Sequence, residues 1–117
     1  MTDRISDAQI EALRNIDTPT ICNLIEMAAP ARRGYGYTVE HLHCIFPEMK
    51  PIVGYAKTAT MRAKQPSKYT AEEYLQIRNN YFDYLNDGDL PKVSIVQDVD
   101  ERPGYGAFWG EVFTAVH

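Results

Sequence analysis

The feature that most constrains this fold is a helical segment placed between two β-branched segments. Residues 52–62 (IVGYAKTATMR) are rich in β-branched side chains and roughly alternate in polarity, which predicts a strand with one face more buried than the other. Thr70 and Glu73 have the spacing of a capping box at a helix start, and residues 93–97 (VSIVQ) are typical of a short strand in an α/β sheet. The order strand, helix, strand predicts an α/β fold.

The predicted middle helix has a stripe of 3.6-residue period that is rich in aromatic side chains, and it has a recognisable end. The stripe consists of Tyr74, Leu75, Ile77, Arg78, Tyr81 and Leu85. The helix is expected to end at Asp87-Gly88-Asp89, and Gly54 is expected to mark a bulge or a close approach of another backbone segment. Ligands of open α/β sheets bind at the carboxyl ends of the strands, so the loop at residues 98–106 is a candidate site.

Two helices are expected before the first strand. Ser6 and Gln9 fit a capping box. A second helix is expected to start with Asp17 or Thr18 as its cap and Pro19 at the first helical position, where the missing N–H costs nothing. The apolar stripe of this second helix is Ile21, Leu24, Ile25 and Ala28.

A long loop separates these helices from the first strand. Pro30 is expected to end the second helix, and residues 31–51 predict an ordered loop with one short strand near residues 41–46. The loop also contains candidate zinc ligands or a candidate Cys–His pair at His41, His43 and Cys44. A zinc site there needs further ligands, which only Cys22 or His117 could supply, and a catalytic pair lacks an orienting third group, so both interpretations are disfavoured.

Composition and charge narrow the class of function. A chain of 117 residues with 44% hydrophobic and 24% charged residues is expected to form one globular domain over residues 1–117. The net charge of -4 argues against nucleic acid as the main ligand, and Arg32-Arg33 is interpreted as a solvated pair. Neither a signal peptide nor a membrane span is predicted, so we expect a cytoplasmic location, no membrane partner, and free thiols at Cys22 and Cys44.

The loop after the second strand offers two kinds of site. Gly104-Tyr105-Gly106 precedes a helix whose first N–H groups would be unpaired, and such a turn can bind a carboxylate or phosphate. The alternative is a loop that only needs positive φ angles at Gly104 and Gly106. Four nearby carboxylates would either hold a hard cation such as Mg²⁺ or form an ordinary solvated surface: Asp98, Asp100, Glu101 and Glu111.

The last residues predict a helix without a stop signal. Residues 107–117 carry apolar side chains at 108, 109, 112, 113 and 116, the spacing of an amphipathic helix that opens at Gly110. A crossover helix normally returns the chain to a parallel strand. We therefore expect that part of the domain lies beyond His117 or is supplied by another chain.

Four segments together resemble one protein family. Their order and approximate spacing resemble those of the RraA-like family, which includes regulators of ribonuclease E activity and metal-dependent 4-hydroxy-4-methyl-2-oxoglutarate aldolases with oxaloacetate decarboxylase activity. The resemblance covers nearly the whole chain. The segments are 17–23 (DTPTICN), 53–59 (VGYAKTA), Gly88-Asp89, and 107–111 (AFWGE).

The resemblance implies a fold, an assembly and a chemistry. The implied fold is a swivelling-type α/β/α sandwich, incomplete at the C-terminus in this chain, and the implied assembly is a homotrimer or homohexamer with active sites at subunit boundaries. In the enzymes of the family a divalent cation, usually Mg²⁺, chelates a 2-oxo acid, and an arginine helps to stabilise the pyruvate enolate. Aldol cleavage and decarboxylation share that enolate, so one site can run both reactions.

The resemblance also implies roles for individual residues. Backbone amides near Phe108, Trp109 and Gly110 would bind the substrate carboxylate. Glu111 stands at the catalytic acidic position, where the family motif has aspartate, and would orient metal-bound water. The Arg–Asp pair that contacts substrate and metal would lie beyond His117, so no metal ligand is assigned within this chain.

The expected function follows from these roles. The chain would be the front part of a Mg²⁺-dependent lyase that cleaves C–C bonds of pyruvate-type 2-oxo acids, as a 4-hydroxy-4-methyl-2-oxoglutarate aldolase or oxaloacetate decarboxylase does, and it would be inactive alone. The alternative is a non-catalytic, protein-binding regulator of the ribonuclease E inhibitor type.

Overall fold

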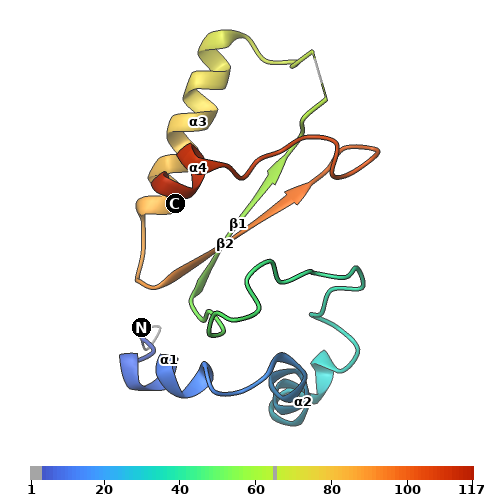
Figure 1. Cartoon of the computed structure of the whole chain (residues 1–117), viewed down its shortest axis with the longest axis vertical. Coiled ribbons are helices and arrows are strands. Elements are labelled where there is room, and N and C mark those ends of the chain that lie inside the picture. The colour runs from blue at the N-terminus through green and yellow to red at the C-terminus, as the bar shows by residue number, and fades with distance from the viewer. Residues whose placement is uncertain (1–3, 65) are drawn as a thin grey trace. The chain divides into compact units, whose positions relative to one another are not determined.

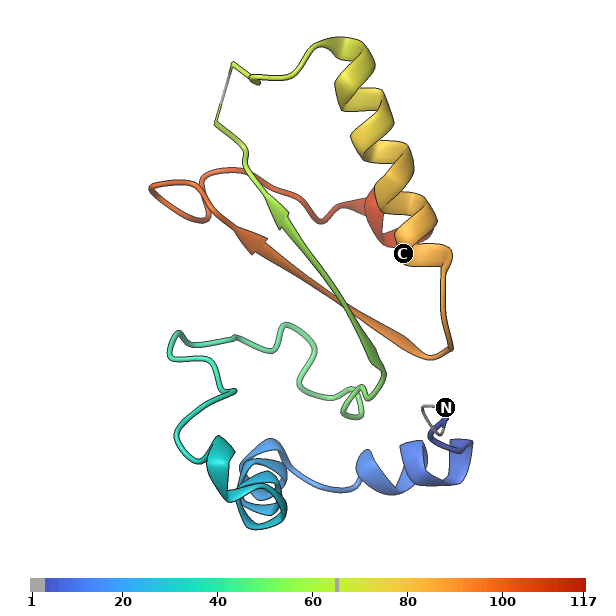
Figure 2. The ribbon, with the colours of Figure 1, turned by 180° about the vertical axis from the view of Figure 1, so that it is seen from behind.

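A computed structural model of the chain describes residues 4–64 and 66–117, and Figures 1 and 2 give two views of its ribbon. The chain divides into two compact units, Met1–Val53 and Gly54–His117. Helices and strands are both present and the strands form a parallel sheet, so the predicted α/β class is confirmed at this coarse level. Within the described residues no helix has the length and apolarity that crossing a membrane requires.

The first unit begins with α1 (Asp7–Leu13), which starts as the sequence predicts. The Ser6 backbone N–H donates to Gln9 Oε1 at 2.8 Å, and the Gln9 backbone N–H donates to Ser6 Oγ at 3.3 Å. These two bonds satisfy donors that the helix itself leaves unpaired. The apolar face of α1 contributes Ile10, which is buried.

The second helix, α2 (Thr18–Ala28), begins directly after Asp17, which is one of the two residues predicted as its cap. Asp17 is the cap, because its Oδ1 accepts from the Thr20 N–H at 2.8 Å. Pro19 is therefore the second helical residue and not the first. The second N–H of a helix is also left unpaired, so proline is tolerated there for the same reason.

The remainder of the first unit contains less regular structure than predicted. A single 3-10 turn, η1 (Pro30–Arg32), follows α2, and the strand expected at residues 41–46 is wrong because no strand forms there. Val39, Leu42 and Ile45 are each more than 80% exposed. A short apolar segment gains its strand stability from cross-strand neighbours, and within this unit the described residues supply none.

The second unit is a parallel strand pair joined by a helix. Strands β1 (Tyr55–Met61) and β2 (Lys92–Asp98) run parallel, with Tyr55 opposite Lys92 and Met61 opposite Asp98, and α3 (Ala71–Asn86) connects them. A Cβ atom on Gly54 would lie 2.7 Å from the carbonyl oxygen of Pro91. The close backbone approach predicted at Gly54 is therefore confirmed.

Capping side chains and two lysines set the limits of α3. The capping box between Thr70 and Glu73 is present at its start. At its end, Lys57 Nζ donates to the carbonyl oxygen of Tyr84 at 2.7 Å, and Lys92 Nζ donates to that of Leu85 at 2.6 Å. Carbonyls of the last helical turn lack partners within the helix and carry the negative end of its dipole, so cations from both strands hold this end of α3.

The two faces of the sheet differ in burial. On the face that carries Lys57 and Lys92, the side chains of both strands are half-buried, whereas Thr58 and Ile95 on the opposite face are exposed. Figures 1 and 2 agree that α4 (Glu111–Val116) lies beside the second half of α3. Among the described residues only Ile10 and Leu85 are buried, so the apolar stripes predicted on α2 and α3 remain largely exposed.

The lysine contacts at the end of α3 give a stability prediction. Replacing Lys57 or Lys92 by Met keeps most of the aliphatic stem and removes the charged hydrogen bond, so each variant should lower the free energy of unfolding by about 1–2 kcal/mol in urea titrations. The control is Lys64→Met, which removes only an exposed 4.0 Å ion pair with Glu101 and should change stability by less than about 0.5 kcal/mol. If all three substitutions lowered the free energy of unfolding equally, the hydrogen bonds of Lys57 and Lys92 would not be what holds α3 to the sheet.

Candidate functional site

The predicted site residues lie on one stretch of chain after the carboxyl end of β2. Gly110 is the N-terminal cap of α4, and Glu111 is its first helical residue. Phe108 is half-buried, whereas Trp109, Gly110 and Glu111 are exposed. Their sequence continuity brings these residues together, but in the described residues no side chain caps the start of α4.

Asp98 organises the first part of this loop through its own backbone. Its Oδ1 accepts from the Asp100 N–H at 2.9 Å and its Oδ2 accepts from the Gly104 N–H at 2.7 Å. These two bonds favour the charged carboxylate, the one from Asp100 more strongly, and they lower the pKa of Asp98 below its usual value. The carboxylate therefore closes a turn at the end of β2.

Asp100 ties the ends of both strands together. Its Oδ2 accepts from the backbone N–H groups of Ala63 at 2.8 Å and Lys64 at 3.1 Å. Its Oδ1 lies 3.6 Å from Arg62 Nε, and the Asp100 side chain is only 5% exposed. A buried carboxylate needs such partners, since burying a charge without them is costly. Asp100 thus fixes the segment after β1 against the segment after β2.

These contacts bear on the hard-cation interpretation of the acidic loop. Both oxygens of Asp98 accept from backbone N–H groups. In Asp100 only Oδ2 does so, while the buried Oδ1 has no hydrogen-bond partner among the described residues and lies 3.6 Å from Arg62 Nε. Glu101 extends into solvent. Across residues 4–64 and 66–117 no three His, Cys, Asp or Glu side chains come together as a cation would require. The rings of His41 and His43 lie 6.4 Å apart, and both cysteines are free thiols, as predicted.

The two glycines of the turn have different roles. Gly104 has a φ of +81°, so the predicted positive φ is confirmed there and a side chain would strain the backbone. Gly106 has no positive φ, and that part of the prediction is wrong. A Cβ on Gly106 would lie 2.1 Å from the Cβ of Ala63, so this glycine is required by close packing against the end of β1.

An aromatic cluster holds the start of α4 against α3. Phe108 lies at the centre, with ring centroids 4.8 Å from Phe113, 5.1 Å from Trp109 and 6.4 Å from Tyr81. His117 joins the cluster 4.9 Å from Trp109. Aromatic pairs at such separations stabilise one another beyond the area that they bury. The side chain of Phe108 is therefore a structural anchor between α3 and α4.

His117 links α4 to α3 by hydrogen bonds that fix its tautomer. Its Nδ1 lies 2.5 Å from the carbonyl oxygen of Phe113, which can only accept, so Nδ1 carries a proton. In the neutral ring, Nε2 then accepts from the Tyr81 hydroxyl at 2.7 Å. Burial, with a smaller contribution from Tyr84, raises the pKa of the Tyr81 hydroxyl, the donor of this bond. The sequence predicts for His117 at most a zinc-ligand role, although its i, i+4 spacing from Phe113 also permits this bond.

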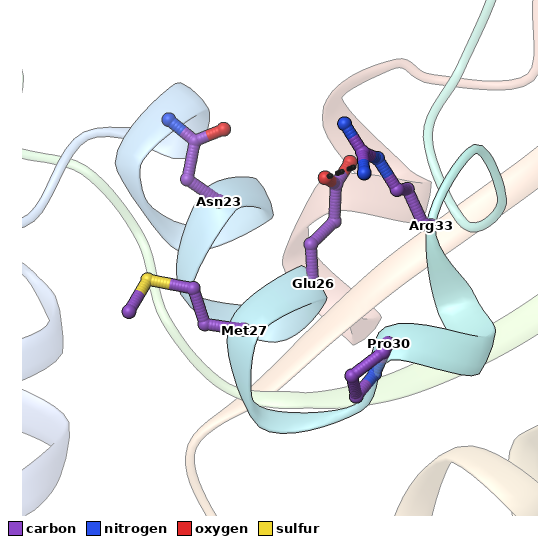
Figure 3. A pocket seen from close by; sticks show the side chains of 5 residues that line it. All are labelled: Asn23, Glu26, Met27, Pro30 and Arg33. Atoms are coloured by element: carbon purple, nitrogen blue, oxygen red, sulfur yellow. Dashed lines mark ion pairs between the residues drawn. The ribbon is translucent and has the colours of Figure 1, made fainter.

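The first unit contains a separate hollow of about 440 Å³ at the end of α2. Figure 3 shows its lining residues, with the Glu26 carboxylate turned toward the Arg33 guanidinium at 3.7 Å. The hollow is shallow and Met27 beside it is 78% exposed. The lining residues are Asn23, Glu26, Met27, Pro30 and Arg33. None of these residues belongs to the predicted site.

The contacts of Asp98 predict how stability depends on pH. A carboxylate whose folded pKa is lowered contributes stability above its ordinary pKa of 3.8, and this contribution is lost as the pH falls through the lower folded value. Asp98→Asn should therefore be destabilising at about pH 7, and the difference from the wild type should shrink toward about pH 2. Urea midpoints across this range provide the measurement.

A neighbouring acid supplies the control for that titration. Glu101→Gln changes an exposed carboxylate in the same loop, 4.0 Å from Lys64, and should leave the pH profile close to that of the wild type. A difference for Asp98→Asn that stays constant with pH would mean that the charged form is not what the two N–H groups stabilise.

The hydrogen bond between Tyr81 and His117 predicts local stability of α4. Tyr81→Phe keeps the ring and removes the hydroxyl, so hydrogen exchange of the α4 amides should accelerate by roughly 2- to 10-fold, as expected for one lost hydrogen bond. Tyr74→Phe on the same helix is the control, because the Tyr74 side chain is 57% exposed. The idea fails if α4 exchanges at the same rate in both variants.

Comparisons of this chain with protein-family models, with curated proteins and with solved structures find no match. The resemblance described in the sequence analysis therefore stays a prediction.

Proposed function

We propose that this chain is the front part of a divalent-metal-dependent lyase that cleaves C–C bonds of pyruvate-type 2-oxo acids. The proposed reactions are aldol cleavage of 4-hydroxy-4-methyl-2-oxoglutarate and decarboxylation of oxaloacetate. Within this function, the backbone at Phe108, Trp109 and Gly110 binds the substrate carboxylate and Glu111 acts as the acidic catalytic residue.

The observation that carries the proposal is the contrast between the two ends of the loop after β2. At its beginning, the N–H groups of Asp100 and Gly104 are bonded to Asp98. At its end, no side chain in the described part of the chain accepts from the first N–H groups of α4. Unpaired backbone donors beside an exposed surface are suited to a carboxylate from outside the chain.

Gly110 supports the same assignment. Its φ of −162° is ordinary extended backbone, and a Cβ built on it would meet no atom within 4 Å. Glycine is one of the residues favoured at a helix N-cap, the position that Gly110 occupies. Its missing side chain also lets a ligand approach the backbone closely.

Glu111 is suited to proton transfer or to orienting a water molecule. It is exposed in the first turn of α4, where a negative charge is favoured by the helix dipole. General acid–base catalysis requires the Glu111 carboxylate to lie within hydrogen-bond distance of the substrate or of a bound water. Glu111 directly follows Gly110, so its carboxylate is adjacent in sequence to the backbone that would bind the substrate carboxylate.

Residues 4–64 and 66–117 do not supply enough ligands to hold the proposed cation, Mg²⁺. Asp98 and Asp100 are committed to backbone N–H groups, and Glu111 alone is too few ligands for a site. When bound, such a cation would polarise the 2-oxo group and stabilise an enolate. The proposal assigns no metal ligand and no metal-dependent step to the described residues.

The remaining parts of the proposal concern fold, assembly and location. The parallel pair β1–β2 with α3 would belong to a swivelling-type α/β/α sandwich. A homotrimer or homohexamer and a cytoplasmic location complete the proposal, with a small 2-oxo acid as the substrate and with neither nucleic acid nor membrane as a partner.

The carboxylate site can be tested with oxalate, a small dicarboxylate that resembles the pyruvate enolate. Titrating oxalate into the ¹⁵N-labelled chain should shift the amide signals of residues 108–112, whereas the Gly104 amide, already bonded to Asp98, should stay in place. Gly110→Ala should weaken oxalate binding by about tenfold or more, because a side chain would then block the approach. Glu111→Gln keeps the backbone donors and should retain binding.

Turnover gives the second half of the test. With oxaloacetate and Mg²⁺, this chain alone should not exceed the rate of the metal-only reaction, whereas a polypeptide from the same gene that contains the family's Arg–Asp pair should release pyruvate. In that polypeptide Glu111→Gln should lower the rate by about 10²- to 10⁴-fold. Unmoved amides at residues 108–112, or full activity of this chain alone, would overturn the assignment.

A second candidate is a non-catalytic, protein-binding regulator. The observation in its favour is the exposed apolar surface of residues 35–52, where Tyr35 is 76% exposed and Ile52 is 72% exposed. Such surface is typical of protein–protein interaction sites. This candidate requires no response to oxalate at the start of α4, so the titration separates the two functions.

A further inference from the structure

The hydrogen bonds at the ends of β1 and β2 show which backbone groups face outward from the strand pair. The Tyr55 N–H donates to the Pro91 carbonyl at 2.8 Å, and the Val99 N–H donates to the Met61 carbonyl at 3.0 Å. In a parallel pair every second residue faces its neighbour. The odd-numbered residues of β2 therefore face β1, and its outward groups belong to Lys92, Ser94, Val96 and Asp98.

The two outer edges of the pair differ. On the outer edge of β1, the Thr58 N–H donates to the Tyr84 hydroxyl of α3 at 3.0 Å, so a side chain covers the middle of this edge. On the outer edge of β2, no backbone N–H or C=O of residues 92, 94, 96 and 98 has a hydrogen bond within the described residues of the second unit, 54–64 and 66–117. An uncovered edge of this kind is a template for another strand.

We propose that the outer edge of β2 pairs antiparallel with the same edge of a second copy of this chain, around a twofold axis at Ile95. The proposal concerns assembly and does not rest on the proposed lyase activity; the twofold contact is compatible with the proposed homohexamer and excludes the homotrimer. A parallel strand that follows α4 in a longer polypeptide is the competing occupant of this edge, and a monomeric wild type would favour it. It joins two strand pairs into one four-stranded sheet in the order β1, β2, partner β2, partner β1. A self-complementary contact of this type closes as a dimer.

The register follows from the length and the outward groups of β2. Full overlap of a seven-residue strand with itself centres the axis on its middle residue, Ile95. The backbone N–H and C=O of Ile95 point toward β1, so Ile95 forms a non-hydrogen-bonded pair with its copy. Ser94 then exchanges both backbone hydrogen bonds with Val96 of the second copy. Shifting the register by two residues would leave outward groups of the strand unpaired at both ends.

The charges at the two ends of β2 also favour a second copy of the same strand as the partner. The central residues 93–97 carry no charge, and the strand has a cation at its start, Lys92, and an anion at its end, Asp98. Antiparallel self-pairing sets Lys92 opposite Asp98 of the second copy at both ends, whereas like charges directly opposite would be destabilising. Lys92 and Asp98 keep their contacts with Leu85 and Gly104, and the pairing adds opposite charges across the interface.

An apolar side chain at the proposed axis is exposed. Ile95, which is 55% exposed in the single chain, would lie beside its copy at the centre of the joined sheet.

Cysteine cross-linking tests the register directly. In a background with Cys22→Ser and Cys44→Ser, Ile95→Cys should form an intermolecular disulfide on mild oxidation, because paired residues of this type have Cα atoms about 4.5 Å apart. Gln97→Cys is the matched control on the same face of the strand. In the proposed register, the two copies of residue 97 lie about 14 Å apart and should not cross-link.

Sedimentation of the wild type tests the assembly without oxidation. The wild-type chain should sediment as a dimer at about 100 µM, and Val96→Pro, which removes an outward N–H and no bond to β1, should be a monomer with an unchanged far-UV spectrum. Equal cross-linking of both cysteine variants, cross-linking of neither in a folded chain, or a monomeric wild type would overturn the proposal. Failure of the oxalate titration would leave these measurements unaffected.

Discussion

The parallel pairing of β1 with β2 is the constraint on which the second unit depends. Parallel strands need a crossover connection, and here α3 provides it. The helix is attached to the sheet chiefly at its end, where Lys57 and Lys92 reach the Tyr84 and Leu85 carbonyls. Leu85 is the buried residue at this point. Two charged hydrogen bonds and one buried leucine therefore fix this end of α3 to the sheet.

The same pairing explains the acidic loop. Two strands that end side by side bring Ala63 and Lys64 next to the loop after β2, where Asp100 accepts from both of their N–H groups. Asp98 then turns the chain back through Gly104. Carboxylates that cluster in sequence can therefore serve the backbone and not a cation, and the distinction depends on where the N–H donors lie.

The sequence predicts the local features well because their causes are local. The capping boxes at Ser6 and Thr70 and the cap at Asp17 each join residues three positions apart. The periodicities that predict β1, α3 and β2 are local as well, whereas the pairing of the two strands joins residues 37 positions apart. The strand predicted at residues 41–46 is wrong because its formation depends on a neighbouring strand, which a local pattern cannot reveal.

The candidate site shows the limit of such prediction more sharply. Phe108, Trp109, Gly110 and Glu111 were identifiable as a group, but what holds them was not: the bond between Tyr81 and His117 spans 36 residues, and that from Ala63 to Asp100 spans 37. A binding loop needs supporting contacts that fix its backbone before the ligand arrives. In this chain the Phe108 ring supplies that support, and Gly110, which neither strain nor packing requires, leaves the adjacent backbone open. The anchored Phe108 and the unobstructed Gly110 two residues later are the features on which the proposed carboxylate site rests.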